Sequence, residues 1–261
     1  MCVFDCETIP DVELIKSQFG LDGDDLEVSL EAFKLQEEKT GSSFLPIPFH
    51  KVVSICAVIA DDYGRFERVS CIDGESEKEL VENFLNFINS KNPKLVSFNG
   101  RAFDMPMLMV RAMKYSLSVP SYFETDNKML NKTKWDNYRY RFSDKFHVDV
   151  MDHISEFGAV RGLKLDLLCT MMGIPGKFDV SGDQVLELYY KGEQKKINEY
   201  CQSDVLNTYW LYLRYELLKG NLLKEDYLNN LSIMKEKLPK DRDYSEVFLD
   251  GLQKELDDSD S

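Results

Sequence analysis

The sequence predicts an α/β protein with a mixed, mainly five-stranded sheet flanked by helices. A β-prone segment opens the chain, and a later apolar run is followed by a hairpin partner, which is typical of antiparallel strands. Further along, helical periodicity alternates with short apolar strands, and this alternation indicates crossovers between strands. At 261 residues the chain is long for one ordinary domain and short for two. We therefore expect a single α/β core with insertions.

The strands of this sheet are expected in five segments. The chain opens on an alternating, β-prone segment that we expect to end near Glu7, before the turn-forming Pro10. A continuous apolar run suits a central strand, and the segment after an Asp-Asp-Tyr-Gly turn suits its antiparallel partner. The expected strands are 1–7, 52–60, 65–72, 94–98 and 146–151.

Helical periodicity marks the segments between and after these strands. Residues 11–49 form an insertion with an acidic amphipathic helix over 26–39 and a loop over 41–48. We expect one domain over 1–220, including this insertion, and a helical extension with an acidic tail over 221–261, of which 257–261 should be disordered. The other expected helices are 75–90, 105–115, 163–172, 183–190, 194–219 and 224–235.

Composition excludes some classes of protein. The formal net charge of −14 argues against a protein that coats duplex DNA, because neutralising phosphates takes many Lys and Arg side chains. No run of about 18 apolar residues occurs, and Met1 leads directly into a strand without the features of a secretory leader. A cytoplasmic protein that does not enter a membrane is therefore expected. Its six cysteines form no CxxC pair and are expected to be reduced core residues, namely Cys2, Cys6, Cys56, Cys71, Cys169 and Cys201.

Two acidic residues stand on the first expected strand. Asp5 and Glu7 are two residues apart, so their carboxylates project from one face while Cys6 faces the other way. Two neighbouring carboxylates invite a cation. A solvated strand face would show the same pattern. Their place at the end of a strand, where sites collect in open α/β sheets, favours the cation site.

A third acid follows the fourth expected strand. Asp104 closes the segment 99–104 (NGRAFD) and stands near the start of a helix. Capping that helix would be an ordinary role for an aspartate at this place. Gly100 allows a tight turn, and Asn99 and Phe103 offer an amide and a ring beside the carboxylate. The segment by itself fits a helix cap and a site residue equally well.

A tyrosine and a fourth acid share one face of the long helix expected over 194–219. Tyr200 and Asp204 are four residues apart, which places the phenol and the carboxylate side by side. That face is otherwise apolar, so Asp204 would be buried without a partner unless something positive meets it. A metal ion would supply that charge.

Four acids from three separate segments, with a helical tyrosine, resemble the motifs of the DEDD exonucleases, which have the RNase H-like fold. Residues 4–8 (FDCET) match the first motif, 99–104 the second and 200–204 (YCQSD) the third. The chain resembles the tyrosine-bearing branch, because Glu199 stands where the other branch has a histidine. The likeness is to stand-alone bacterial proteins related to the proofreading domain of family-B DNA polymerases, and it extends over about 1–218.

This resemblance implies an RNase H-like domain that removes nucleoside monophosphates from single-stranded 3′ ends. It also implies two Mg²⁺ or Mn²⁺ ions. Asp5 would bridge both ions, Glu7 and Asp204 would bind the ion that carries the attacking water, and Asp104 would hold the other. Tyr200 would orient the water, because a phenol with a pKa of about 10 is poorly suited to act as a base.

Residues 128–147 interleave basic and aromatic side chains, which suits a track for a single strand. Basic side chains follow phosphates, and aromatic faces stack on unpaired bases. A partly buried loop with ordinary surface charges would have the same composition. The candidate substrate contacts are Thr8, Asn99, Phe103, Lys134, Trp135, Arg139 and Arg141.

Two other functions remain open at this point. RNase D-like enzymes share the tyrosine motif and degrade RNA, and no residue here reads a 2′-hydroxyl directly. DNA is favoured because the second motif and the segment that begins at His50 resemble the polymerase-type group. The other alternative is a catalytically silent scaffold that binds nucleic acid, which the presence of all four acids opposes.

Overall fold

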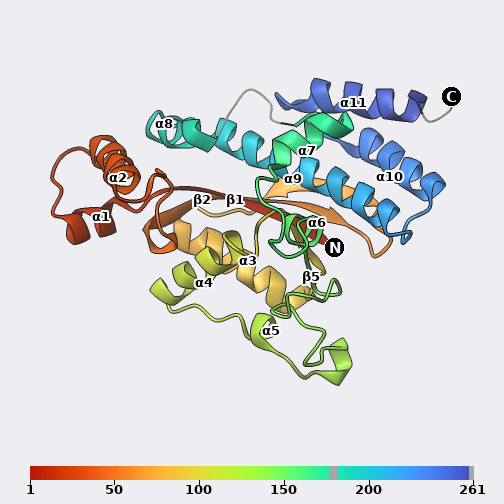
Figure 1. Cartoon of the computed structure of the whole chain (residues 1–261), viewed down its shortest axis with the longest axis horizontal. Helices are drawn as coiled ribbons and strands as arrows, with labels where there is room; N and C mark the ends of the chain where they lie inside the picture. The colour runs from red at the N-terminus through yellow and green to blue at the C-terminus, as the bar shows by residue number, and fades with distance from the viewer. Residues whose placement is uncertain (177–181, 259–261) are drawn as a thin grey trace.

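The computed structural model describes residues 1–176 and 182–258 of the chain. Within these ranges five strands form one sheet in the order β3-β2-β1-β4-β5, with β1 at its centre (Figure 1). The strands are β1 (Cys2–Pro10), β2 (His50–Ala60), β3 (Phe66–Cys71), β4 (Leu95–Ser97) and β5 (His147–Asp149).

The sheet is mixed. Strand β1 pairs antiparallel with β2, and β2 with β3, whereas β1 runs parallel to β4 and β4 to β5. The predicted α/β class with an RNase H-like mixed five-stranded sheet is therefore confirmed. Strand β1 is longer than expected and continues past Glu7, because Ile9 and Pro10 still pair with Lys51 and His50 of β2.

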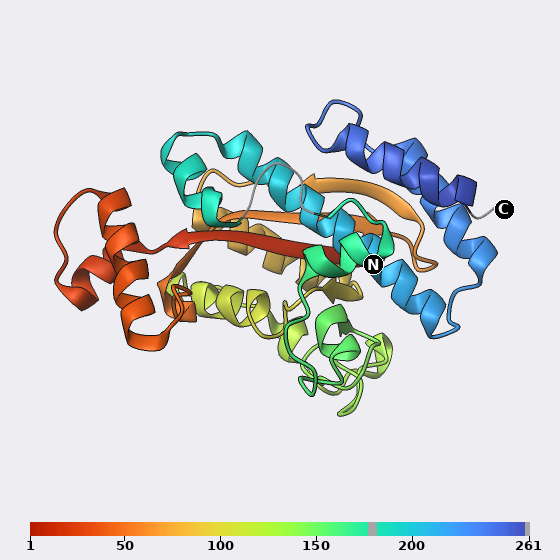
Figure 2. The same ribbon diagram turned by 45° about the horizontal axis from the view of Figure 1, so that its top comes forward.

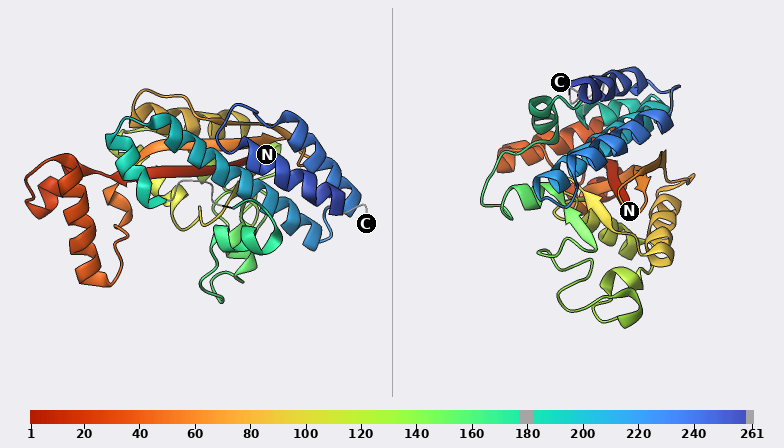
Figure 3. Two further views of the ribbon diagram at one scale, coloured as in Figure 1. Left: turned by 90° about the horizontal axis from the view of Figure 1, so that it is seen from above. Right: turned by 90° about the vertical axis from the view of Figure 1, so that its right-hand side faces the viewer.

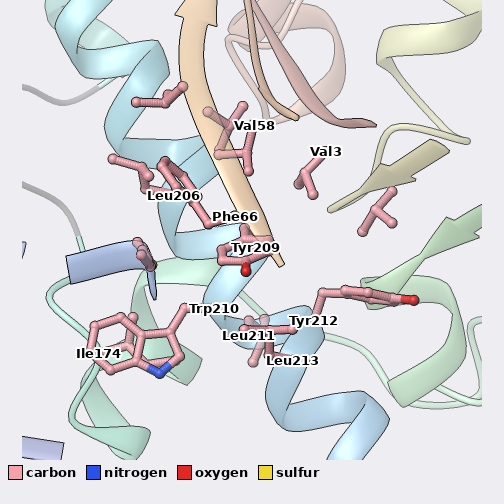
Figure 4. Packing of buried hydrophobic residues seen from close by; sticks show 14 of the residues in the cluster. Val3, Val58, Phe66, Ile174, Leu206, Tyr209, Trp210, Leu211, Tyr212 and Leu213 are labelled. Carbon is pink, nitrogen blue, oxygen red and sulfur yellow. The ribbon is translucent and has the colours of Figure 1, made fainter. Parts of the chain in front are cut away.

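Helices cover both faces of the sheet (Figures 1 and 2). One face carries α3 (Glu77–Lys91), α4 (Asp104–Lys114) and α5 (Pro120–Phe123), and the other carries the long helix α9 (Gln194–Leu218). Side chains of β1 alternate between two cores. Phe4 and Cys6 belong to the core that includes α3 and α4, while Val3 packs with Val58 of β2 and Leu206 of α9 (Figure 4). Residues in step with Val3, such as Asp5, therefore face α9.

The insertion forms a small helical unit beyond the end of β1 (Figure 3). It contains α1 (Val12–Phe19), α2 (Asp25–Thr40) and the short 3₁₀ helix η1 (Ile47–Phe49). Helix α2 confirms the helix expected over 26–39. Helix α1 was not predicted, because eight residues give little periodicity to recognise. The two helices enclose a small core of their own, made of Val12, Ile15, Val28, Ala32 and Leu45.

The C-terminal helices α10 (Lys224–Lys237) and α11 (Ser245–Asp258) pack onto the face of α9. The Trp210 Nε1 atom donates a hydrogen bond to the Tyr227 hydroxyl at 2.9 Å, so this extension shares one core with α9. Helix α11 was not predicted as a separate element. It includes Asp257 and Asp258, the first residues of the tail expected to be disordered, and 259–261 lie outside the described residues.

The strand expected over 146–151 is shorter than predicted. Strand β5 ends at Asp149, whose carboxylate accepts the backbone N–H of Asp152 at 3.2 Å and so begins helix α6 (Val150–Ile154). No helix in the described ranges is long and apolar enough to cross a membrane. The remaining elements are η2 (Lys128–Leu130), α7 (Leu165–Met172), η3 (Gly182–Gln184) and α8 (Val185–Tyr190).

The prediction that all six cysteines are reduced is wrong for one pair. Cys56 of β2 and Cys71 of β3 form a disulfide. They lie directly opposite each other in the antiparallel ladder, with 3.8 Å between their Cα atoms. Residues fifteen apart in sequence were brought together by strand register, which spacing alone does not reveal. The other four cysteines are free and buried, as expected.

Candidate metal centre

The first two predicted acids lie together on β1, beneath α9. Oxygen atoms of Asp5 and Glu7 and the Sγ atom of Cys201 all lie within 4.8 Å of one another. The register of β1 against β2 shifts between Glu7 and Thr8, where β2 carries one extra residue. Such a bulge bends a strand and redirects its side chains. The predicted alternation is present, because the carboxylates of Asp5 and Glu7 lie together, and the bulge of β2 lies directly beside this pair.

Helix α9 brings the predicted tyrosine and the fourth acid to this pair. The Cys201 thiol donates to the backbone carbonyl of Asp5 at 3.5 Å, which fixes the helix against β1. Burial, and then the carboxylates of Asp204, Glu7 and Asp5, keep the pKa of Tyr200 above its usual value. The Asp204 carboxylate also accepts a hydrogen bond from this phenol. Tyr200 is therefore a neutral hydrogen-bond donor beside the acids.

The third acid comes from the turn between β4 and α4. Asp104 is the first residue of α4 and Phe103 occupies the N-cap position before it, so Asp104 is not the N-cap that the alternative required. The side chain is 4% exposed, and its Oδ1 atom has no hydrogen-bond partner among the described residues. Burial raises the pKa of Asp104 to about 7. A buried carboxylate oxygen of this kind is costly unless a ligand satisfies it.

The turn that delivers Asp104 is held by the neighbouring strand. The Asp149 carboxylate accepts the backbone N–H groups of Asn99 and Arg101 at 2.9 and 2.8 Å. Asn99 adopts a left-handed conformation with φ 67°. Gly100 is needed for a different reason, because a Cβ atom there would lie 2.5 Å from the Cβ of Ser97. The turn thus places the start of α4 close against β4.

Three of the four acids meet in one cavity of about 570 Å³. Glu7 and Tyr200 are not among the described residues that line it, although both lie close to acids that do. Burial raises the pKa of Asp5 well above its usual value, and the charges of Asp104, Glu7 and Asp204 raise it further. Asp5 is therefore close enough to each of the other three carboxylates for their charges to repel its own. The lining residues are Asp5, Cys6, Phe98, Asn99, Phe103, Asp104, Met151, Leu163, Lys164, Leu165, Asp166, Asp204 and Asn207.

These residues fit a hard divalent cation. Carboxylate oxygens are the ligands that Mg²⁺ and Mn²⁺ prefer, and a cation would remove the repulsion around Asp5. The unsatisfied Oδ1 of Asp104 supplies one such ligand. The Cys201 thiol is a poor ligand here, because burial, with the nearby Asp5 and Glu7, raises its pKa well above the usual value and keeps it protonated.

Two of the predicted substrate contacts line the cavity, and Thr8 does not. Asn99 and Phe103 line it, as an interaction with the substrate requires. Thr8 instead shares a hydrogen bond of 2.9 Å with Nδ1 of His50. Lys164 and Asn207 also line the cavity and were missed, because the segment 163–172 shows only the periodicity of a helix and Asn207 stands in an otherwise apolar part of α9.

The expected track over 128–147 is partly structural. Lys132 is buried, and its Nζ atom donates to Asn92 Oδ1 and to the Ser121 carbonyl, each at 2.6 Å. Arg141 forms an ion pair with Asp152 at 2.7 Å. Lys134, Trp135 and Arg139 are exposed, and the Lys134 ammonium lies 4.8 Å from the Trp135 ring. None of these four predicted contacts (Lys134, Trp135, Arg139 and Arg141) lines the cavity, so their role stays a prediction.

Comparisons with known proteins find two DNA polymerases that are similar to this chain. The chain is 24% identical over 150 residues to a DNA polymerase of Archaeoglobus fulgidus, a match that covers 55% of this chain and 19% of the polymerase. Among solved structures, the family B DNA polymerase of Pyrobaculum calidifontis aligns with a TM-score of 0.49 and 19% identity, over 90% of this chain and 25% of that one. The chain thus spans a quarter or less of the length of these two polymerases.

A protein-family model matches most of the chain. It covers residues 42–252 and is described as a predicted 3′-5′ exonuclease related to the exonuclease domain of PolB. The match includes Asp104, Tyr200 and Asp204 and begins after Asp5 and Glu7. More than half of the chain is covered, and the acids inside and outside the matched range lie together in space. The chain therefore belongs to the family of predicted 3′-5′ exonucleases related to the exonuclease domain of PolB.

Proposed function

We propose that this protein is a metal-dependent 3′-5′ exonuclease that trims single-stranded DNA ends. The observation that carries this proposal is the meeting of Asp5, Asp104 and Asp204 in one cavity, with a buried oxygen of Asp104 left unsatisfied. Family membership supports the same reaction. A purely structural aspartate would have both carboxylate oxygens satisfied within the protein, so the unsatisfied Oδ1 of Asp104 beside Asp5 and Asp204 favours a site that binds cations.

The positions of the residues support the following roles. Asp5, Glu7, Asp104 and Asp204 would hold two Mg²⁺ or Mn²⁺ ions, with Asp5 shared because it is close to the other three. When bound, the ions supply a nucleophilic water and neutralise charge on the phosphate. Tyr200 stays protonated and donates a hydrogen bond, so it orients the water beside Asp204. Asn99 and Phe103 line the same cavity and would contact the terminal nucleotide.

Replacing Tyr200 with phenylalanine is expected to lower kcat by roughly 10²-fold, the lower end of what positioned proton donors and acceptors contribute. Affinity for Mn²⁺ should not change, because the phenol is no metal ligand. Steady-state rates and Mn²⁺ titration by electron paramagnetic resonance test both points. Tyr212→Phe is the matched control, since Tyr212 is another buried tyrosine of α9. An unchanged kcat in Tyr200→Phe would remove the water-orienting role.

Lys164 is the one basic side chain among the described residues that line the cavity. It is exposed and stands just before α7, so its ammonium can meet a phosphate of the bound strand. A charge-assisted hydrogen bond of this kind contributes about 1.5–3 kcal/mol. Lys164→Ala should therefore raise KM about tenfold or more, and Lys164→Arg should keep most of the affinity. Lys191→Ala, which removes an exposed lysine paired with Glu187, should leave KM unchanged.

The proposed function is tested with 5′-labelled single-stranded DNA and RNA in the presence of Mg²⁺ or Mn²⁺. We expect a ladder of shortened DNA strands, released mononucleotides and slower loss of RNA. Chelation of the metal and the variant Asp104→Asn should both stop the reaction. Faster loss of RNA would assign the protein to the exoribonucleases. Binding of the strands without cleavage would identify a silent scaffold.

The nucleic-acid partner of the enzyme is part of the same proposal. We propose single-stranded DNA 3′ ends as the substrate, with the exposed residues Lys134, Trp135 and Arg139 guiding the strand before it reaches the cavity. Stacking on exposed rings and contact with phosphates do not depend on base sequence. The cytoplasmic location expected from the sequence stays a prediction.

A further inference from the structure

A second cavity, of about 540 Å³, lies where β2 extends beyond β3. The last pair between these strands joins Cys56 to Cys71, so no strand among the described residues pairs with 51–54 on this side. The lining comes from 51–54, from the turn before α3, from the starts of α3 and α9, and from single residues beside α4 and in α8. No described residue lines both this cavity and the acidic one, so the two sites are separate.

Side chains close the open edge of β2 and so build the walls of this cavity. The backbone N–H of Val52 donates to the Glu77 carboxylate at 2.7 Å. The Gln194 amide donates to the Val53 carbonyl at 2.9 Å. These bonds use backbone groups that a further strand would need. The cavity therefore suits a small ligand better than an added strand.

Lysine and amide donors of this lining have no acceptor in the part of the chain that the structure describes. The Lys51 ammonium lies 5.8 Å from the centroid of the Tyr189 ring, and neither Lys51 nor Lys78 forms an ion pair there. The Asn198 Oδ1 atom accepts the Ser54 hydroxyl at 2.8 Å, which leaves the Nδ2 group of Asn198 to donate to a ligand. Two ammonium groups and an amide suit an anion with several acceptor oxygens, such as a phosphate.

The local charge favours an anion, although the formal net charge of the chain is −14. Two acids line the cavity, Glu75 and Glu77. Glu77 is buried and paired with Arg111, whereas Glu75 is exposed to solvent. The charges of Lys51 and Lys78 therefore outweigh that of the one acid without a buried cation beside it.

The cavity also has an aromatic lining. Tyr115 follows α4 and Tyr189 belongs to α8, and both contribute to the wall. Tyrosine rings can stack on a nucleobase of any sequence. Sites for small molecules usually have volumes of about 300–1,000 Å³, so this cavity has room for more than a bare phosphate. Phosphate and base occur together in a nucleotide.

The elements around this cavity also position residues of the metal centre. Val53 is the extra residue of β2 at the bulge, where the register shifts between Glu7 and Thr8. Asn198 precedes Tyr200 by two residues in α9. A ligand in this cavity would therefore contact the strand that pairs with Glu7 and the helix that carries Tyr200.

We propose that this cavity binds a nucleoside monophosphate, with its phosphate on Lys51 and Lys78 and its base against the tyrosine rings. Nucleoside monophosphates are the product of the proposed reaction, so the choice of this class rests on the proposed function. Binding here needs no metal, whereas the carboxylates of the acidic cavity repel a phosphate until cations neutralise them. The site thus holds the product outside the metal centre.

The test measures the binding of deoxyadenosine 5′-monophosphate by isothermal titration calorimetry in the presence of a chelator. Lys51→Ala and Lys78→Ala should each raise Kd about tenfold or more, as expected for the loss of a charge-assisted hydrogen bond. Inorganic phosphate should bind more weakly than the nucleotide. Tyr189→Leu should raise Kd for the nucleotide about fivefold or more and leave Kd for inorganic phosphate unchanged, because stacking involves only the base.

Two control variants separate this cavity from its surroundings. Lys195 is an exposed lysine of α9 that pairs with Glu199 at 3.5 Å and does not line the cavity, so Lys195→Ala should keep the wild-type Kd. Asp104→Asn should keep it as well, because Asp104 lines the acidic cavity. A changed Kd in Asp104→Asn would place the nucleotide in the acidic cavity and so refute the second site.

Three other results would also refute the nucleotide site. They are no binding of the nucleotide by the wild type in the chelator, wild-type affinity in both lysine variants, and inorganic phosphate that binds as tightly as the nucleotide. None of these measurements involves cleavage, so each leaves the exonuclease proposal intact. A wild-type protein that binds the nucleotide and cleaves no strand with Mg²⁺ or Mn²⁺ would refute the exonuclease proposal alone.

Discussion

Replacing Asp5 with asparagine is expected to abolish nuclease activity, with kcat/KM lowered by roughly 10³-fold or more, because metal ions typically supply several kcal/mol of transition-state stabilisation. Asp5 is the acid whose charge interacts with all three of the others, Glu7, Asp104 and Asp204. Loss of its negative charge therefore weakens the whole metal site. Asparagine has nearly the same shape, so the fold should remain intact.

The same substitution should not destabilise the metal-free protein. In the folded state, burial and three neighbouring carboxylates make the ionised form of Asp5 unfavourable. A neutral amide removes that penalty, so the thermal unfolding midpoint measured in a chelator should stay equal or rise. Addition of Mn²⁺ should raise the midpoint of the wild type and should raise that of Asp5→Asn much less.

The control for Asp5→Asn is Asp62→Asn, an exposed acid in the turn between β2 and β3, which should change neither rate nor metal response. Two results would contradict the metal site. One is nuclease activity within tenfold of the wild type in Asp5→Asn. The other is a clear loss of stability in the chelator, which would show that Asp5 has a structural role.

Replacing Arg111 with methionine is expected to cost about 3–5 kcal/mol of unfolding free energy, the usual effect of removing one partner from a buried ion pair. Arg111 is 2% exposed. Its Nη1 atom donates to Asp11 at 2.6 Å, and its Nη2 atom donates to Glu77. Glu77 in turn accepts the backbone N–H of Val52 at 2.7 Å. The variant would leave two carboxylates buried without this cation.

This network also matters for the site, because it joins the elements that carry the acids. Arg111 belongs to α4, which begins with Asp104, and Asp11 directly follows β1, which carries Asp5. Val52 pairs with Thr8 at the bulge of β2, where the register shifts. Loss of Arg111 should therefore lower metal affinity as well as stability.

Urea unfolding monitored by circular dichroism measures the loss of stability in Arg111→Met. Arg65→Met is the control, because its pair with Asp61 is exposed and 4.0 Å long, and such pairs contribute little. Adding Glu77→Gln to Arg111→Met should recover part of the loss, since one buried charge is removed. A decrease in unfolding free energy of less than about 1 kcal/mol in Arg111→Met would mean that the network does not hold these elements together.

Local patterns were enough to predict the elements that carry the acids. The two-residue period of a strand places Asp5 and Glu7 on one face, and the four-residue spacing on a helix joins Tyr200 to Asp204. Both relations hold in the structure, with β1 in the middle of the sheet and α9 across it. These relations depend on a few neighbouring residues, which is why the sequence alone reveals them.

Long-range contacts explain what was not predicted. The Cys56–Cys71 disulfide depends on the register between β2 and β3, and the burial of Lys132 depends on contacts with Asn92 and Ser121. A lysine that looks like a phosphate contact in the sequence is instead bound inside the protein. Charge and residue type do not show whether a side chain will be buried.

By itself, the sequence determined the α/β class, the order of the five strands and which acids and tyrosine to consider. Tertiary structure decided that three of these acids share a cavity with an unsatisfied oxygen on Asp104, and that Lys164 lines the same cavity. The physical reason is that strand and helix periods act over a few residues. A cavity forms where distant segments pack, and its lining depends on the packing of the whole chain.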